Sequence, residues 1–196
     1  MKQHASILTS FRLSIHELTF IGVTSAALGL AFWGWTAIDV LLAPVLESFG
    51  FRFLFAGFWL IPGIFAPFII RKPGVALLSS LIAAFVEGML SKWGLLSIFW
   101  GLSQGLGSEL IFVLFRYRYW RTGILYLASL SAALASYALS YYHAECYLLS
   151  TRYNLLQVGI LLASSLIFSA YLTQTLIQKL GPTGLLKPFA IADSDL

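Results

Sequence analysis

Apolar runs long enough to cross a bilayer make up most of this chain, and they decide what it can fold into. Of the 196 residues, 59% are hydrophobic and only 10% are charged, whereas about 25% of the residues in a soluble domain carry charge. In lipid every backbone polar group needs a partner within the protein, which leaves helices or a closed barrel. Barrel strands alternate apolar and polar residues, but the runs here are continuous, as in 77–90. The sequence therefore predicts an all-α integral membrane protein.

The spacing of turn signals predicts six membrane spans in a single membrane domain covering 1–196. A spanning helix needs about 20 apolar residues, and signals such as Pro73-Gly74 and Gly181-Pro182 separate runs of about that length. A short tail begins at about residue 181. The predicted spans of this six-transmembrane-helix bundle are 16–36, 51–70, 74–91, 94–115, 123–142 and 154–178.

The basic residues predict how these spans are oriented. With six spans, Arg52, Lys92 and Arg152 fall on one side of the membrane and the other nine of the 12 Lys and Arg residues fall on the opposite side. Loops rich in Lys and Arg are retained in the cytoplasm, so we expect both termini and the tail to be cytoplasmic. Topology then explains the basic pI of about 9.3, and no nucleic-acid partner is expected.

Two carboxylates, Glu87 and Glu109, lie within the apolar runs of predicted spans. A charge at membrane depth costs about 2.5 kcal/mol or more, so such a group usually faces a polar cavity or a partner. We interpret Glu87, in the outer half of the third span, as a ligand for a cationic or amine-bearing solute. The alternative is a structural partner for a base such as Lys92 or Arg52. For Glu109 both interpretations stay open, because it lies about 140° around the helix from Gln104.

The fourth span carries a row of groups that suit a flat polar ligand. Trp100, Gln104 and Ser108 recur every four residues, so an indole, an amide and a hydroxyl share one helical face. Each single Trp near a span end could instead belong to an interfacial aromatic belt. The candidate binding residues on the first two spans are Trp33, Trp35, Asp39 and Trp59.

Motifs for catalysis and metal binding are missing from the sequence. It contains no HExxH, no Walker A, no G-x-S-x-G and no CxxC. Its one cysteine and three scattered histidines predict no metal site, and no cofactor is expected. Because the chain has no ATP-binding motif, uphill transport would need a partner or an ion gradient.

Several short motifs together resemble one known family. They are Gly57-Phe58-Trp59-Leu60, Ile70-Arg71-Lys72-Pro73-Gly74, Glu87-Gly88, Trp93-Gly94 and Gln104-Gly105-Leu106-Gly107-Ser108-Glu109-Leu110. This set is similar to the YkoE family, substrate-binding S components of energy-coupling factor (ECF) vitamin transporters. The resemblance implies a protein of the prokaryotic plasma membrane that binds thiamin or its hydroxymethylpyrimidine moiety from outside.

The resemblance also implies partners. A transmembrane scaffold, the T component, and two ATPase subunits would supply the energy, and only those partners would bind ATP. Ala27 and Ala31 on the first span would dock the scaffold. From spacing alone, this small-residue pair could equally serve packing within the bundle.

The ligand chemistry favours thiamin over hydroxymethylpyrimidine, because a thiazolium cation suits tryptophan faces and a nearby carboxylate. An aminopyrimidine suits stacking and an amide edge. Three other functions stay open: a carrier for another vitamin or amine, a membrane-embedded lipid enzyme, and a structural subunit. The enzyme would need a nucleophile or metal cluster near the interface, and the structural subunit leaves the buried carboxylates without a purpose.

Overall fold

The structure, a computed structural model, describes residues 12–193, and every regular element in this range is helical. The α-helices are α2 (Ile15–Ser48), α3 (Pro62–Ile70), α4 (Val75–Leu90), α5 (Ser97–Leu114), α6 (Thr122–His143), α7 (Thr151–Ser164) and α8 (Leu172–Leu180). A π-helical segment, η4 (Ser165–Tyr171), joins α7 to α8. The 3-10 helices are η1 (Ala56–Leu60), η2 (Gly94–Leu96), η3 (Cys146–Leu148), η5 (Gly181–Thr183) and η6 (Ala190–Asp193).

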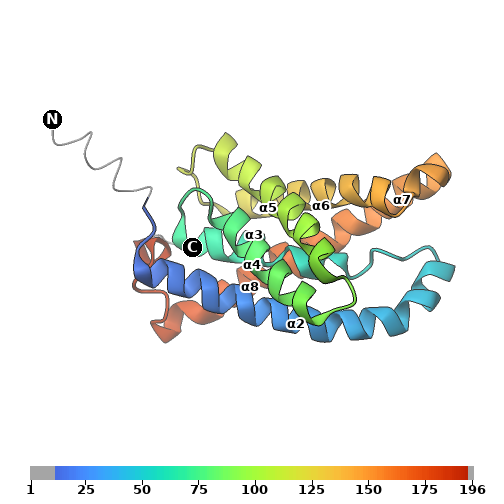
Figure 1. Cartoon of the computed structure of the whole chain (residues 1–196). Helices are drawn as coiled ribbons and strands as arrows, with labels where there is room; N and C mark the ends of the chain where they lie inside the picture. The colour runs from blue at the N-terminus through green and yellow to red at the C-terminus, as the bar shows by residue number, and fades with distance from the viewer. Residues whose placement is uncertain (1–11, 194–196) are drawn as a thin grey trace.

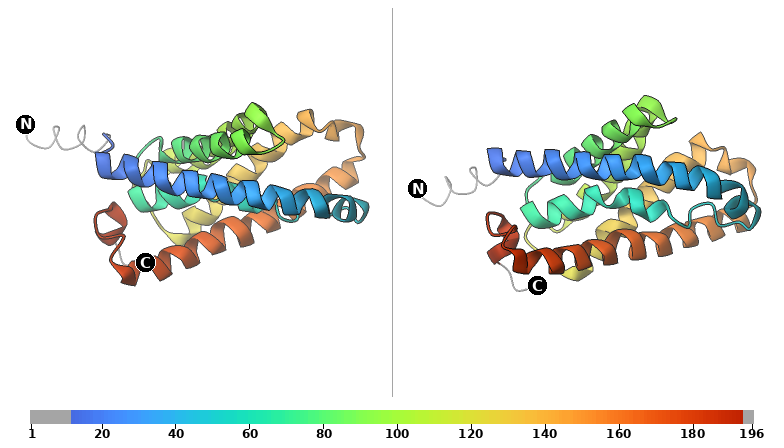
Figure 2. Two further views of the ribbon diagram at one scale, coloured as in Figure 1. Left: turned by 60° about the horizontal axis from the view of Figure 1, so that its bottom comes forward. Right: turned by 90° about the horizontal axis from the view of Figure 1, so that it is seen from below.

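The helices run alongside one another, and both ends of the described chain lie at the same end of the bundle (Figures 1 and 2). Within residues 12–193, four helical segments are long and apolar enough to cross a membrane: Ile15–Ser48, Gly94–Leu114, Thr122–His143 and Thr151–Thr183. Two shorter apolar segments, Ala56–Ile70 and Val75–Leu90, correspond to the second and third predicted spans. The chain is thus a multi-pass membrane protein by helix length and composition, while the count of six spans stays a prediction.

Two of the helices differ in extent from the predicted spans, whose boundaries in the membrane stay predictions. The first helix continues to Ser48, because its apolar run extends well past residue 36 and Pro44 does not interrupt the helix. The second predicted span is not one helix. Residues 51–55 form turns, η1 follows, and Pro62 then begins α3. Proline is favoured at the first position of a helix, where its missing N–H is not needed.

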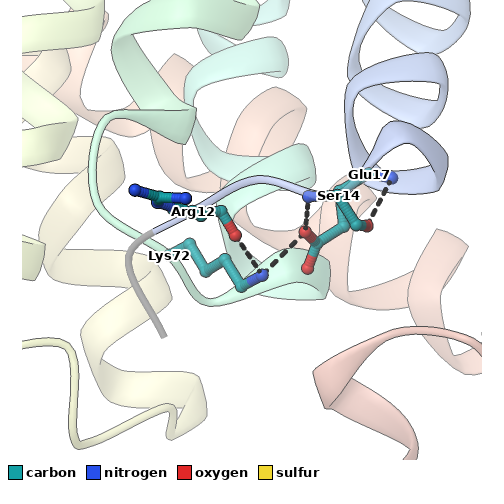
Figure 3. Close-up of polar contacts among 4 residues, drawn as sticks. All are labelled: Arg12, Ser14, Glu17 and Lys72. Carbon is teal, nitrogen blue, oxygen red and sulfur yellow. Dashed lines mark hydrogen bonds and ion pairs between the residues drawn. The ribbon is translucent and has the colours of Figure 1, made fainter. Parts of the chain in front are cut away.

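The beginning of α2 is fixed to the turn between α3 and α4 (Figure 3). Ser14 and Glu17 form a reciprocal capping box at the N-terminus of α2. Glu17 Oε2 also lies 2.7 Å from Lys72 Nζ, and Lys72 donates a second hydrogen bond to the carbonyl of Arg12. These contacts tie the first turn of α2 to the α3–α4 turn.

Helix α4 is enclosed by α2 and α5, and glycines allow the close approach on both sides. A Cβ atom added at Gly29 of α2 would lie 2.6 Å from the Ala83 carbonyl oxygen, and one added at Gly101 of α5 would lie 2.5 Å from the Ala84 Cβ. Any larger residue at these positions would force the helices apart. The protein thus covers much of this short helix.

The apolar core fills the half of the bundle that holds the chain ends. It is built around α3, all of whose residues are buried, and it includes Phe112, Leu125 and Ile177. The opposite half is packed less completely, and there polar side chains line the cavity described below.

Basic side chains separate between the two ends of the bundle. The turns that contain Arg52 and Lys92, and the beginning of α7 with Arg152, lie at the end away from the chain termini (Figure 1). The other described basic residues fall in the segments at the terminal end, and Lys2 lies outside the described residues. The cytoplasmic location of both termini stays a prediction.

Candidate functional site

A cavity of about 480 Å³ opens in the half of the bundle away from the chain ends. Pockets that hold small ligands measure about 300–1,000 Å³. Side chains from α2, the segment 52–59, α4, α5 and α6 line it. We call the side chains of Trp59, Ser80, Glu87 and Gln104 the floor, because Ser80, Glu87 and Gln104 are buried and Trp59 contacts Glu87. The mouth consists of Asp39, Glu47, Arg52, Lys92 and His143.

Glu87 is the buried carboxylate of the floor, with only 5% of its surface exposed. Its Oε1 accepts hydrogen bonds from Thr36 Oγ1 and from Trp59 Nε1, each 2.8 Å long. Within residues 12–193, no hydrogen bond reaches Oε2 and no ion pair joins Glu87 to a base. One carboxylate oxygen is therefore held by the protein, and the other is available to a ligand.

Amide, hydroxyl and indole groups surround this carboxylate. Gln104 donates a long hydrogen bond of 3.4 Å to Ser136, and Trp100 donates one of the same length to Ser140. Ser80 also lines the cavity, and its hydroxyl has no hydrogen-bond partner among the residues that the structure describes. The floor thus offers one acceptor, two groups of either polarity and one aromatic ring, and Trp100 adds a second ring to the cavity.

The mouth carries both signs of charge. Glu47 lies 3.7 Å from Arg52 in a loose, half-exposed ion pair, and Lys92 Nζ lies 4.8 Å from the centre of the Trp93 ring. Asp39 is half-buried beside them, in electrostatic range of Lys92 and Arg52. With Glu87, the cavity contains three carboxylates and two permanent cations, so its net charge favours a cationic solute.

Three predicted site residues, Trp33, Trp35 and Ser108, lie outside the cavity. Phe32, Thr36 and Val40 recur every four residues on the face of α2 that looks toward Glu87, and Trp33 and Trp35 fall on either side of this face. Trp33 is 50% exposed, while Trp35 packs against Phe55 and Phe58. Ser108 is buried beneath the floor and donates to the carbonyl of Gln104.

Glu109 also lies outside the cavity, and its contacts are structural. Its two oxygens accept hydrogen bonds from the backbone N–H groups of Gly74, Ala76 and Leu77, at 2.7–3.3 Å. These groups belong to the first turn of α4, which has no side-chain cap of its own because Gly74 precedes it. The Tyr117 hydroxyl donates to the same carboxylate. Burial, this hydrogen bond and the nearby negative charge raise the pKa of Tyr117, so the hydroxyl keeps its proton.

Thr36 and Ser80 are two residues that the sequence reasoning missed: Ser80 lines the cavity, and Thr36 donates a hydrogen bond to Glu87. Hydroxyl residues are ordinary in apolar helices, since they can bond to the preceding turn of their own backbone. One signal was present for Ser80, which precedes Glu87 by seven residues and therefore shares its helical face. Nothing in the local sequence distinguished Thr36.

The predicted docking residues lie on the opposite face of α2. Ala27 and Ala31 are both exposed, next to Val23 and Leu30, which are 64% and 52% exposed. This strip faces away from the bundle, so it does not serve packing within the described chain.

Comparisons with known proteins agree with the resemblance found from the motifs. Residues 16–138 match the model of a family described as "ABC-type cobalt transport system, permease component". The chain is 29% identical over 178 residues to "Putative HMP/thiamine permease protein YkoE" of Bacillus subtilis (strain 168), covering 90% of this chain and 89% of that protein. A solved structure described as "Crystal structure of an S-component of ECF transporter" matches with a TM-score of 0.88 and 28% identity, over 92% of each chain. The similarity to YkoE is confirmed.

Proposed function

The chain belongs to the family of ABC-type cobalt transport system permease components, and on this basis we propose that it is the substrate-binding S component of an ECF importer for thiamin or its hydroxymethylpyrimidine moiety. Its likeness to an S component and to a vitamin permease makes it a transport protein for vitamin uptake, not an enzyme. The finer assignment of the cargo rests on the cavity, and above all on Glu87, whose Oε2 is left open to a ligand.

The cavity chemistry suits each part of thiamin. The exocyclic amino group of the pyrimidine is a donor that Glu87 can accept, and Ser80 and Gln104 can bond to the ring nitrogens. Trp59 and Trp100 supply aromatic faces for stacking. The thiazolium cation would lie toward Asp39, where a carboxylate has no bonded partner among the described residues. Hydroxymethylpyrimidine carries no such cation, so the Asp39 carboxylate favours thiamin.

The energy source would be separate from this chain. We propose that a T component and two ATPase subunits form the partner module in the plasma membrane of a prokaryote, with both termini of this chain cytoplasmic. The exposed strip at Ala27 and Ala31 would receive the scaffold, because small side chains let a partner helix come close.

Cargo binding to the purified protein tests this proposal. We expect thiamin to quench tryptophan fluorescence saturably in detergent without ATP, because Trp59, Trp93 and Trp100 surround the cavity. Glu87→Gln should weaken thiamin binding about tenfold or more, a loss of about 1.4 kcal/mol. Glu109→Gln makes the same change outside the cavity and should leave the affinity within about twofold.

Saturable binding of neither thiamin nor hydroxymethylpyrimidine would overturn the proposal. An unchanged affinity in Glu87→Gln would remove this residue from the site. Mass spectrometry of any ligand that co-purifies would reveal another vitamin or an amine as the cargo.

A further inference from the structure

Both protein hydrogen bonds to Glu87 reach the same oxygen, and this asymmetry bears on how the cavity selects its cargo. We propose that Thr36 is a positioning residue, which orients the Glu87 carboxylate so that Oε2 accepts an N–H from the cargo. The cavity would then select an amino-substituted ring over the same ring bearing an oxo group. This inference rests on the proposed function.

The geometry fixes the carboxylate from three elements. Thr36 lies on α2, Trp59 on η1 and Glu87 on α4, and both donors lie 2.8 Å from Oε1. A carboxylate oxygen has about two lone-pair positions, so these two donors fill Oε1. Any further donor, including one on the cargo, is directed to Oε2.

The polarity of the contact is fixed as well. The indole N–H of Trp59 can only donate, so Oε1 must be an acceptor, and the two hydrogen bonds that it receives favour the ionised form of Glu87. An ionised carboxylate can only accept, whereas the amide of Gln104 and the hydroxyl of Ser80 can each either donate or accept. Glu87 is therefore the group on the floor that can tell an amino substituent from an oxo substituent.

Loss of the Thr36 hydroxyl should weaken this discrimination. The carboxylate would keep only the Trp59 bond, so it could turn about its last side-chain torsion. It would also lose one of the two donors that stabilise its negative charge in a buried site, and a protonated carboxyl group can donate to an oxo group. Thiamin affinity should fall while the affinity for the oxo analogue falls less or rises.

Thr24 provides a matched control on the same helix. Its hydroxyl donates to the Phe20 carbonyl within α2, over 2.6 Å. Thr24→Val therefore removes the same hydroxyl from the same helix and leaves Glu87 untouched.

The test compares two dissociation constants for each protein, one for thiamin and one for the thiamin analogue with an oxo group in place of the pyrimidine amino group. The wild type should prefer thiamin by about tenfold or more, because the oxo group of the analogue would face Glu87 Oε2 and both are hydrogen-bond acceptors. Thr36→Val should reduce this ratio at least about threefold, and Thr24→Val should keep it.

Thr36→Ser retains the donor and should keep the wild-type ratio. A ratio that is unchanged in a folded Thr36→Val protein overturns the proposal. Should Thr36→Val fail to fold, Trp59→Phe removes the other donor to the same oxygen. Trp59→Phe should also reduce the ratio at least about threefold, and an unchanged ratio would overturn the proposal. A wild type that binds both ligands equally overturns this inference alone, whereas a wild type that binds neither overturns the proposed function with it.

Discussion

Two adjacent serines of α4 face different surroundings, and they separate binding from stability at the scale of single residues. Ser80 lines the cavity floor, where its hydroxyl has no partner among the described residues. We expect Ser80→Ala to lower thiamin affinity about three- to tenfold, the value of one ordinary hydrogen bond. Fluorescence titration measures the affinity, and thermal unfolding in detergent should change little.

Ser79 is the control for this prediction. It is fully buried away from the cavity and donates to the Pro62 carbonyl on α3, over 2.7 Å. Ser79→Ala should therefore cost about 1 kcal/mol of stability and leave the affinity unchanged. If Ser80→Ala destabilises the protein without weakening thiamin binding, Ser80 belongs to the packing and not to the site.

Rare polar groups in apolar helices were the most informative residues in the sequence. Membrane helices retain such groups only for a reason, but the reason has to come from the fold. Glu109 of α5 caps the preceding helix, α4, which becomes evident only when the two helices are seen side by side. Thr36 gave no signal, because its role depends on a carboxylate 51 residues away. The predicted residues that line the cavity are Asp39, Trp59, Glu87, Trp100 and Gln104.

At the scale of elements, the packing of η1 against the long α7–α8 helix positions Trp59. The Gly57 N–H donates to Ser164 Oγ over 2.9 Å, and a Cβ atom at Gly57 would lie 2.3 Å from the Ser164 carbonyl oxygen. Gly57→Ala should therefore push η1 away, destabilise the protein by about 1–3 kcal/mol and weaken thiamin binding. Thermal unfolding and fluorescence titration measure the two effects.

Gly159→Ala is the matched control for that element. Gly159 is exposed on α7 with no atom within 4 Å of an added Cβ. Alanine is the better helix former, so this change should stabilise α7 by about 0.5–1 kcal/mol. Equal stability of the two variants would show that η1 adapts without strain.

The existence of the apolar segments could be predicted from the sequence, but their ends could not. Hydropathy indicates the length of apolar chain that crosses a bilayer. A helix can continue beyond that length, as α2 does. The second segment changes from 3-10 helix to α-helix at Pro62, which takes the first position of α3, where its missing N–H is not needed. Six apolar segments were expected from the turn signals, and the two short ones are those enclosed by neighbouring helices.

At the scale of the whole molecule, the cavity and the small-residue strip lie on opposite faces of α2, so binding and docking should be separable. Replacing both Ala27 and Ala31 by Leu should leave thiamin affinity within about twofold. The bulk should lower thiamin uptake about tenfold in cells that also express an ECF module, because the partner helix is held away. Radiolabelled uptake and fluorescence titration report these two outcomes.

Ala138→Leu makes the same change on α6, where Ala138 is also exposed, and uptake should stay at the wild-type level. If uptake by the doubly substituted protein is normal, the scaffold docks elsewhere. A loss of thiamin binding in that protein would mean instead that the strip supports the cavity.

The length of α2 has a consequence for how a cargo arrives. Its 34 residues extend about 51 Å at 1.5 Å per residue, while the hydrocarbon layer is about 30 Å thick. The helix thus exceeds the hydrocarbon layer by about 20 Å, and Asp39 and Glu47 lie in the part that follows the predicted span 16–36. A hydrated vitamin cation would thus reach the mouth of the cavity among lipid headgroups and water. It would lose its hydration shell only where dipoles of the protein replace the water.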